Sequence, residues 1–184
     1  PRSLFSLDES VFDMLTKAEI TMKNNRKNPN EFSKLKETVY AILEKYEMQA
    51  ATTTNLIPGI LETLKALKQM KLKLALFSIN GKKSTNHILE TFKLRNYFQA
   101  VITRDSVPMI KPNPVHLETT LKKLKVQPSE TLVVGDSTTD IKSAQQLNAT
   151  AIAVTYGITQ PEKLAQAGAN HIITSPIELI TIIE

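Results

Sequence analysis

From Pro58 onward, the chain alternates between short apolar segments typical of strands and longer segments whose apolar residues recur at helical spacing. Strands are predicted at residues 72–79, 99–103, 131–135, 150–154 and 171–174. Helices are predicted at residues 58–70, 84–92, 115–124, 138–147, 161–167 and 176–183. Helical connections are typical of parallel strands, and nearly continuous apolar strands indicate that both faces of the sheet are covered. The sequence therefore predicts an α/β fold, with an open, mostly parallel sheet and helices on both faces.

Before Pro58, the pattern from residue 11 to about residue 54 is helical only. "SVFDMLTKAEITMK" places Leu15 and Ala18 among apolar residues at helical spacing, and "NPNEFSKLKETVYAILEKYEM" has a second apolar face that begins after Pro29. The following "QAATTTN" is predicted to be a connector. Ahead of these helices, "RSLF" is typical of a short apolar strand.

Composition excludes several classes of protein. The 184 residues include no cysteine, which excludes disulfides and cysteine-based metal sites and makes the cell interior the default location. We see no secretory signal and no apolar run of roughly 20 residues, so we expect a cytoplasmic protein without a membrane segment. The net charge is +5, but the one basic cluster, residues 23–36, contains a single aromatic residue. A solvated helix face is therefore favoured there over a nucleic-acid surface.

Polar side chains follow several of the predicted strands, where ligands of open parallel sheets bind. These candidate site residues are Ser6, Asp8, Ser78, Lys111 in "IKPNP", and Asp136 and Asp140 in "VVGDSTTDI". Carboxylates at strand ends can hold Mg²⁺, and a metal ion with a lysine can neutralise phosphoryl oxygens. A serine hydroxyl can bind a further oxygen, and a carboxyl group can protonate a leaving alcohol. The set suits transfer of a phosphoryl group.

Each of these residues also has a structural interpretation. Ser137 and Asp140 have the spacing of a capping box for the next helix. Ser78 could be a buried strand-end hydroxyl, Lys111 a solvated loop lysine, and Asp8 a turn carboxylate that starts a helix. The three histidines show no metal-ligand spacing and are interpreted as surface or core residues: His87, His116 and His171.

Taken together, the strand ends resemble the haloacid dehalogenase (HAD) superfamily, in its phosphoglycolate-phosphatase-like branch with a small helical cap. "LALFS" with Ser78 matches the second of the family's four motifs, and "IKPNP" with Lys111 matches the third. "LVVGDSTTDI" matches the fourth through Asp136 and Asp140. The resemblance implies a Rossmann-like core at 1–12 and 56–184, with a small all-helical cap at 13–55. It also implies an Mg²⁺-dependent phosphatase that acts on a small phosphorylated metabolite.

The family's first motif is a strand followed by D-x-D-x-T/V, in which the first Asp is the nucleophile and the second the general acid/base. "FSLDESVFD" lines up with the family pattern "FDLDGTLVD", which puts Asp8 at the acid/base position and Ser10 at the threonine position. The nucleophile position falls on Ser6. The resemblance places Mg²⁺ on Asp8, Asp136 and Asp140. A register with Asp8 as nucleophile spoils the match to Phe5, so we prefer the first.

Two hypotheses follow from Ser6. A neutral serine hydroxyl needs an adjacent base to become a nucleophile, and the missing carboxylate weakens the metal site while removing a charge that repels phosphate. The first hypothesis is an active phosphatase that uses Ser6, another residue or a metal-bound water. The second is a catalytically inactive HAD-like protein that binds a phosphorylated ligand or a protein partner. An engineered nucleophile substitution is a third possibility, although Asn or Ala is commoner and Glu9 then has no explanation.

Overall fold

The computed structural model describes residues 9–183, so the predicted first strand with Ser6 and Asp8 lies outside the described residues. The chain divides into two compact units, with the boundary between Glu47 and Met48. Within residues 9–183, no helix combines the length and the apolar character that crossing a bilayer requires.

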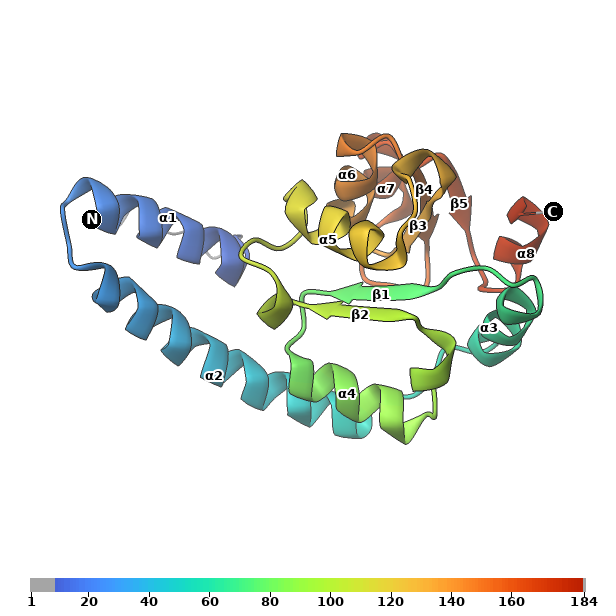
Figure 1. Ribbon diagram of the computed structural model, residues 1–184, viewed down its shortest axis with the longest axis horizontal. Helices are drawn as coiled ribbons and strands as arrows, with labels where there is room; N and C mark the ends of the chain where they lie inside the picture. Colours follow the sequence, from blue (N-terminus) through green and yellow to red (C-terminus); the bar gives the residue numbers. More distant parts are fainter. Residues whose placement is uncertain (1–8, 184) are drawn as a thin grey trace. The chain divides into compact units, whose positions relative to one another are not determined.

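The first unit is formed by helix α1 (Val11–Asn24) and most of helix α2 (Pro29–Thr53) (Figure 1). Ser10 caps α1: its hydroxyl oxygen accepts from the backbone N–H of Asp13 at 3.1 Å and its O–H donates to the Asp13 carboxylate at 2.6 Å. The rings of Phe12 and Tyr40 meet edge to face, with centroids 6.5 Å apart, and join the two helices. The helical character predicted for residues 11–54 is therefore confirmed for these two helices.

Helix α2 is longer than predicted. It continues to Thr53, so most of "QAATTTN" is helical rather than a connector. Alanines favour the helix, and this stretch contains no glycine or proline to end it. The connector begins only after Thr53, ahead of Pro58.

The second unit alternates helices and strands as the sequence predicts (Figure 1). In chain order its helices are α3 (Ile60–Gln69), α4 (Lys82–Thr91), α5 (Pro114–Leu124), α6 (Thr138–Gln146), α7 (Pro161–Gln166) and α8 (Glu178–Ile183). Its strands are β1 (Ala75–Ser78), β2 (Ala100–Thr103), β3 (Leu132–Gly135), β4 (Thr150–Val154) and β5 (His171–Ile173). Short 3-10 turns lie at Arg95–Tyr97, Arg104–Ser106 and Pro128–Glu130.

Strand β1 starts later than the predicted segment 72–79 because its first residues close helix α3. Lys71 has a positive φ of 60°, and the N–H of Leu72 donates to the carbonyl of Leu67 at 3.2 Å. These are the features of a helix C-terminus, which uses backbone groups that a strand would need.

All described strand pairs are parallel, which confirms the prediction. Ala75 pairs with Ala100 in β1–β2, Leu132 with Thr150 in β3–β4, and Ile152 with His171 in β4–β5. The sequence predicts one sheet, whereas the described residues form two hydrogen-bonded sets, β1–β2 and β3–β4–β5. In both sets the strand carboxyl ends carry the candidate site residues.

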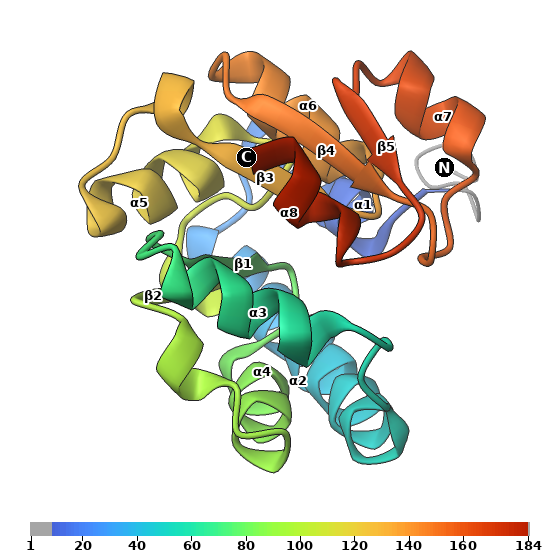
Figure 2. The ribbon, with the colours of Figure 1, turned by 90° about the vertical axis from the view of Figure 1, so that its right-hand side faces the viewer.

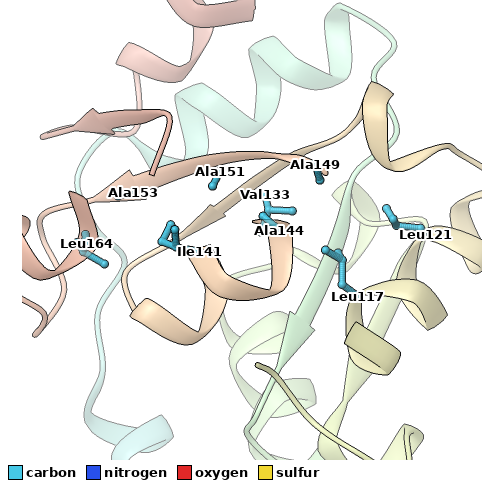
Figure 3. Packing of buried hydrophobic residues seen from close by; sticks show 9 residues of the cluster. All are labelled: Leu117, Leu121, Val133, Ile141, Ala144, Ala149, Ala151, Ala153 and Leu164. Atoms are coloured by element: carbon cyan, nitrogen blue, oxygen red, sulfur yellow. The ribbon is translucent and has the colours of Figure 1, made fainter. Parts of the chain in front are cut away.

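Strand β4 separates two hydrophobic clusters, because successive side chains of a strand point to opposite faces. Ala151 and Ala153 pack against helices α5, α6 and α7 (Figure 3). The members of this cluster are Leu117, Leu121, Val133, Ile141, Ala144, Ala149, Ala151, Ala153 and Leu164. Ile152 and Val154 pack on the opposite face against residues of α3 and α8. The ribbons of these two helices are drawn in Figure 2. Helices therefore cover both faces of the sheet, as predicted.

Candidate functional site

Lys111 and Asp140 form the central ion pair of the candidate site. Lys111 lies in the loop before α5 and Asp140 in the first turn of α6, and Nζ of Lys111 donates to Oδ1 of Asp140. The side chains are only 11% and 4% exposed. Because water screens them poorly, each charge depends on the other for compensation. Thus Lys111 is not the solvated loop lysine of the structural interpretation.

The Lys111 side chain also lies over an aromatic ring. Nζ is 4.6 Å from the centroid of Phe77, the residue that precedes Ser78 in β1. A cation at this distance is attracted by the electron-rich face of the ring. This contact links the Lys111 loop to the carboxyl end of β1, where Ser78 lies.

The loop that carries Lys111 is fixed by its own sequence. Asn113 caps α5, since its side-chain oxygen accepts from the N–H of Val115 at 3.0 Å, and Pro114 occupies the first helical position, where no N–H is needed. "KPNP" thus orders the chain directly after Lys111.

Asp140 both caps helix α6 and pairs with Lys111. Its Oδ2 accepts from the hydroxyl of Ser137 at 2.6 Å and from the N–H of Ser137 at 3.2 Å. Ser137 Oγ in turn accepts from the N–H of Asp140 at 3.3 Å, which completes the capping box. A Cβ on Gly135 would overlap the Asp140 side chain, so the glycine lets β3 end close to this carboxylate. The structural interpretation of Asp140 is confirmed, and it coexists with the contact to Lys111.

Asp136 directly follows β3 and is exposed, in contrast to Asp140. The loop after β4 lies against it, because a Cβ on Gly157 would overlap the Asp136 side chain. Burial raises the pKa of Tyr156, and the negative charge of Asp136 raises it further. The parallel pairing of β3 and β4 therefore brings an accessible carboxylate, a neutral phenol and a glycine together at one edge.

Ser78 is the last residue of β1 and is half-buried. Its Oγ accepts from the N–H of Asn80 at 3.1 Å, which shapes the turn into α4. A hydroxyl whose oxygen accepts in this way can still donate its own proton. The structure therefore fits both the structural interpretation of Ser78 and the functional one.

Of the predicted site residues, the structure brings Lys111 and Asp140 into direct contact and places Ser78 and Asp136 at strand ends. Ser6 and Asp8 lie outside the described residues. Within residues 9–183, no three or more His, Cys, Asp or Glu side chains are grouped as a metal site would need. Asp136 and Asp140 are the predicted ligands that the structure does describe, and both follow β3.

Sequence reasoning missed three neighbours of the site. His116 is buried, as one interpretation expects, but it also bonds the backbone of Lys111. Tyr156 and Gly157 follow the predicted strand 150–154 directly, so inspection of every strand end would have found them. His116 gives a weaker signal, its position five residues after Lys111 at a predicted helix start.

Comparison with known proteins agrees with this geometry. A family model described as haloacid dehalogenase-like hydrolase matches residues 9–154. A phosphoglycolate phosphatase from Vibrio vulnificus is 32% identical over 138 residues, which cover 75% of this chain and 60% of the relative. The chain therefore spans about 60% of the length of the curated relative that it matches.

Two solved structures have a similar fold. A hydrolase from Pseudomonas syringae aligns with a TM-score of 0.72 and 25% identity over 92% of this chain and 75% of that chain. A protein described as a predicted phosphoglycolate phosphatase from Haemophilus somnus aligns with a TM-score of 0.70 and 25% identity, over 93% of this chain and 76% of that chain.

Proposed function

The chain belongs to the haloacid dehalogenase-like hydrolase family, and we propose that it is an Mg²⁺-dependent phosphatase that acts on a small phosphorylated metabolite. The observation that carries this proposal is the buried Lys111–Asp140 pair at the strand ends, with the exposed Asp136 between β3 and the helix that carries Asp140. A fixed ammonium group neutralises charge on phosphoryl oxygens at little reorganisation cost. The Ser78 hydroxyl supplies a further donor.

The carboxylates at the strand ends fit Mg²⁺. This ion prefers oxygen ligands and is usually held by one or two carboxylates, substrate phosphate and water. Asp136 is exposed and can reach it, and Asp8 is the second proposed ligand. The two oxygens of Asp140 already accept hydrogen bonds from Lys111 and Ser137. This supports a role in orienting Lys111 more than direct coordination of Mg²⁺. When bound, Mg²⁺ would neutralise the phosphoryl group.

The remaining assignments follow the family's first motif. Asp8 is proposed to protonate the leaving alcohol, and Ser6 stands at the nucleophile position. Residues 13–55 are proposed as the cap and residues 1–12 and 56–184 as the core, and helices α1 and α2 support the helical character of the cap. The absence of cysteine supports a cytoplasmic location.

Ser6 supports a second candidate function. A neutral serine hydroxyl is a weak nucleophile unless a base activates it, so the same site can bind a phosphorylated ligand with little turnover. Binding and hydrolysis therefore have to be measured separately. Phosphoglycolate is the first substrate to test, since the Vibrio vulnificus relative is a phosphoglycolate phosphatase.

We expect orthophosphate and phosphoglycolate to bind to the protein in the presence of Mg²⁺, and Asp136→Asn to weaken this binding by about tenfold or more, because one full charge leaves the metal site. Calorimetric titration with and without Mg²⁺ measures the affinity, and release of phosphate measures turnover. Glu162→Gln, at an exposed carboxylate on α7, is the matched control and should bind normally. Failure to bind either ligand, combined with no turnover, would refute the proposal.

Gly157→Ala should raise the Mg²⁺ concentration needed for half-maximal phosphate binding several-fold. The added methyl group overlaps the Asp136 side chain, so the carboxylate or the loop has to move. Ile158→Ala in the same loop is the control, because this side chain is 98% exposed. An unchanged Mg²⁺ dependence in Gly157→Ala would show that the position of Asp136 is not important for the metal ion.

A further inference from the structure

His116 is buried at the start of α5, where its ring contacts two strands and the Lys111 loop. It is 0% exposed. Its Nδ1 lies 3.3 Å from the backbone nitrogen of Lys111, and its Nε2 lies 3.3 Å from the carbonyl oxygen of Ile102 in β2. The ring meets Phe77 of β1 edge to face, with centroids 5.4 Å apart. One side chain therefore joins β1, β2 and the loop that carries the site lysine.

The chemistry of these partners sets the protonation of the ring. The backbone N–H of Lys111 can only donate, so Nδ1 must accept and carry no proton. The carbonyl of Ile102 can only accept, so Nε2 carries the proton. Burial lowers the pKa of His116, and this outweighs the bond to Ile102, which raises it. The neutral ring thus satisfies both partners. In an imidazolium, the proton on Nδ1 would face the backbone N–H of Lys111, so two donors would meet without an acceptor.

A purely space-filling role does not require a histidine at this position. A buried imidazole loses its hydration and recovers that cost only if both nitrogens find partners. A phenylalanine would fill a similar volume and keep the edge-to-face contact with Phe77. What histidine adds is the pair of bonds to Lys111 and Ile102, which tie the lysine backbone to the end of β2.

We propose that His116 is a positioning residue that anchors the backbone of Lys111, so that the ammonium group is presented to the phosphoryl group at the strand ends. Two ends of the lysine are then held by different partners. His116 holds the backbone N–H, while Asp140 and the Phe77 ring hold the ammonium. His116 also steadies the ring of Phe77 on which the ammonium lies. The expected effect on phosphate binding rests on the proposed function, but the anchoring of the Lys111 backbone by His116 can be measured without any ligand.

The first test uses the unaltered protein and its 15N-labelled histidines. Ring 15N shifts should show His116 with an unprotonated Nδ1 and a protonated Nε2 near neutral pH. The amide of Lys111 should exchange slowly with solvent. A protonated Nδ1 would overturn the proposal whatever the protein binds.

The second test compares three variants. His116→Phe keeps the ring packing and loses both hydrogen bonds, so exchange of the Lys111 amide should accelerate and orthophosphate affinity should fall, each by about tenfold. His116→Asn offers an amide oxygen near the place of Nδ1 and should restore part of both. Thr120→Val is the control, because its buried hydroxyl donates to the backbone carbonyl of His116 and leaves the ring untouched.

The outcomes separate this proposal from the proposed function. If His116→Phe keeps a protected Lys111 amide and normal orthophosphate affinity, the positioning role is refuted. If the unaltered protein binds no orthophosphate, the proposed function fails, and protection of the Lys111 amide alone decides whether His116 anchors the loop. A loss of stability equal in His116→Phe and His116→Asn, without recovery of phosphate binding in the latter, would indicate a core role only.

Discussion

Ser6→Asp is expected to increase the rate of Mg²⁺-dependent phosphate release by about two orders of magnitude or more. The substitution supplies a carboxylate that is ionised at neutral pH, whereas the serine hydroxyl needs a base to become a nucleophile. Under the proposed function, in which Asp8 is a ligand of Mg²⁺, it also adds a second charged oxygen ligand two positions earlier in the sequence and should strengthen Mg²⁺ binding. Initial rates on phosphoglycolate at saturating Mg²⁺, for the unaltered protein and the variant prepared together, measure the effect.

Two further variants identify the source of any turnover. Ser6→Ala should be as slow as the unaltered protein if the hydroxyl takes no part in the reaction. Adding Asp136→Asn to Ser6→Asp should remove most of the gained rate, since the new carboxylate depends on the metal ion. Robust turnover by the unaltered protein that disappears in Ser6→Ala would contradict this expectation and would identify Ser6 as a working nucleophile.

Much of the fold could be predicted because it depends on local patterns. The bounds of β4, Thr150–Val154, agree with prediction, since an apolar run this short between turn residues suits a buried strand better than a helix. Segment 72–79 was predicted less well, because Leu72 completes the end of α3 through a backbone bond that side-chain pattern does not encode. The extension of α2 to Thr53 was missed because polar threonines there resemble a loop.

The candidate site was predicted at the level of strand ends but not of contacts. The pairing of Lys111 with Asp140 joins residues that lie 29 positions apart, and only the packing of α5 and α6 on the strands brings them together. The same packing buries His116, which the sequence shows as one of three scattered histidines. Long-range contacts of this kind depend on tertiary structure. A sequence motif can therefore identify candidate site residues without indicating which of them are in contact.

Lys111→Met is expected to lower the free energy of unfolding by about 3 kcal/mol, because it leaves the Asp140 carboxylate buried without its counter-ion. Asp140→Asn should also destabilise, since it isolates the buried ammonium. The double variant should cost less than the sum of the two single variants, with a coupling energy above about 1 kcal/mol. Urea denaturation of the four proteins measures this cycle, provided that the slope with denaturant stays constant.

Both single variants should lower the free energy of unfolding, but they should differ in orthophosphate affinity. Lys111→Met removes the cation and should abolish orthophosphate binding, whereas Asp140→Asn keeps the ammonium and should only weaken it.

The surface pair of Lys23 and Glu19, with nitrogen and oxygen 3.5 Å apart, is the control for the stability cycle and should have a coupling energy below about 0.5 kcal/mol. Additive stabilities for Lys111→Met and Asp140→Asn would contradict a buried ion pair. Equal phosphate binding in the two variants would mean that Lys111 contributes no charge to the ligand site.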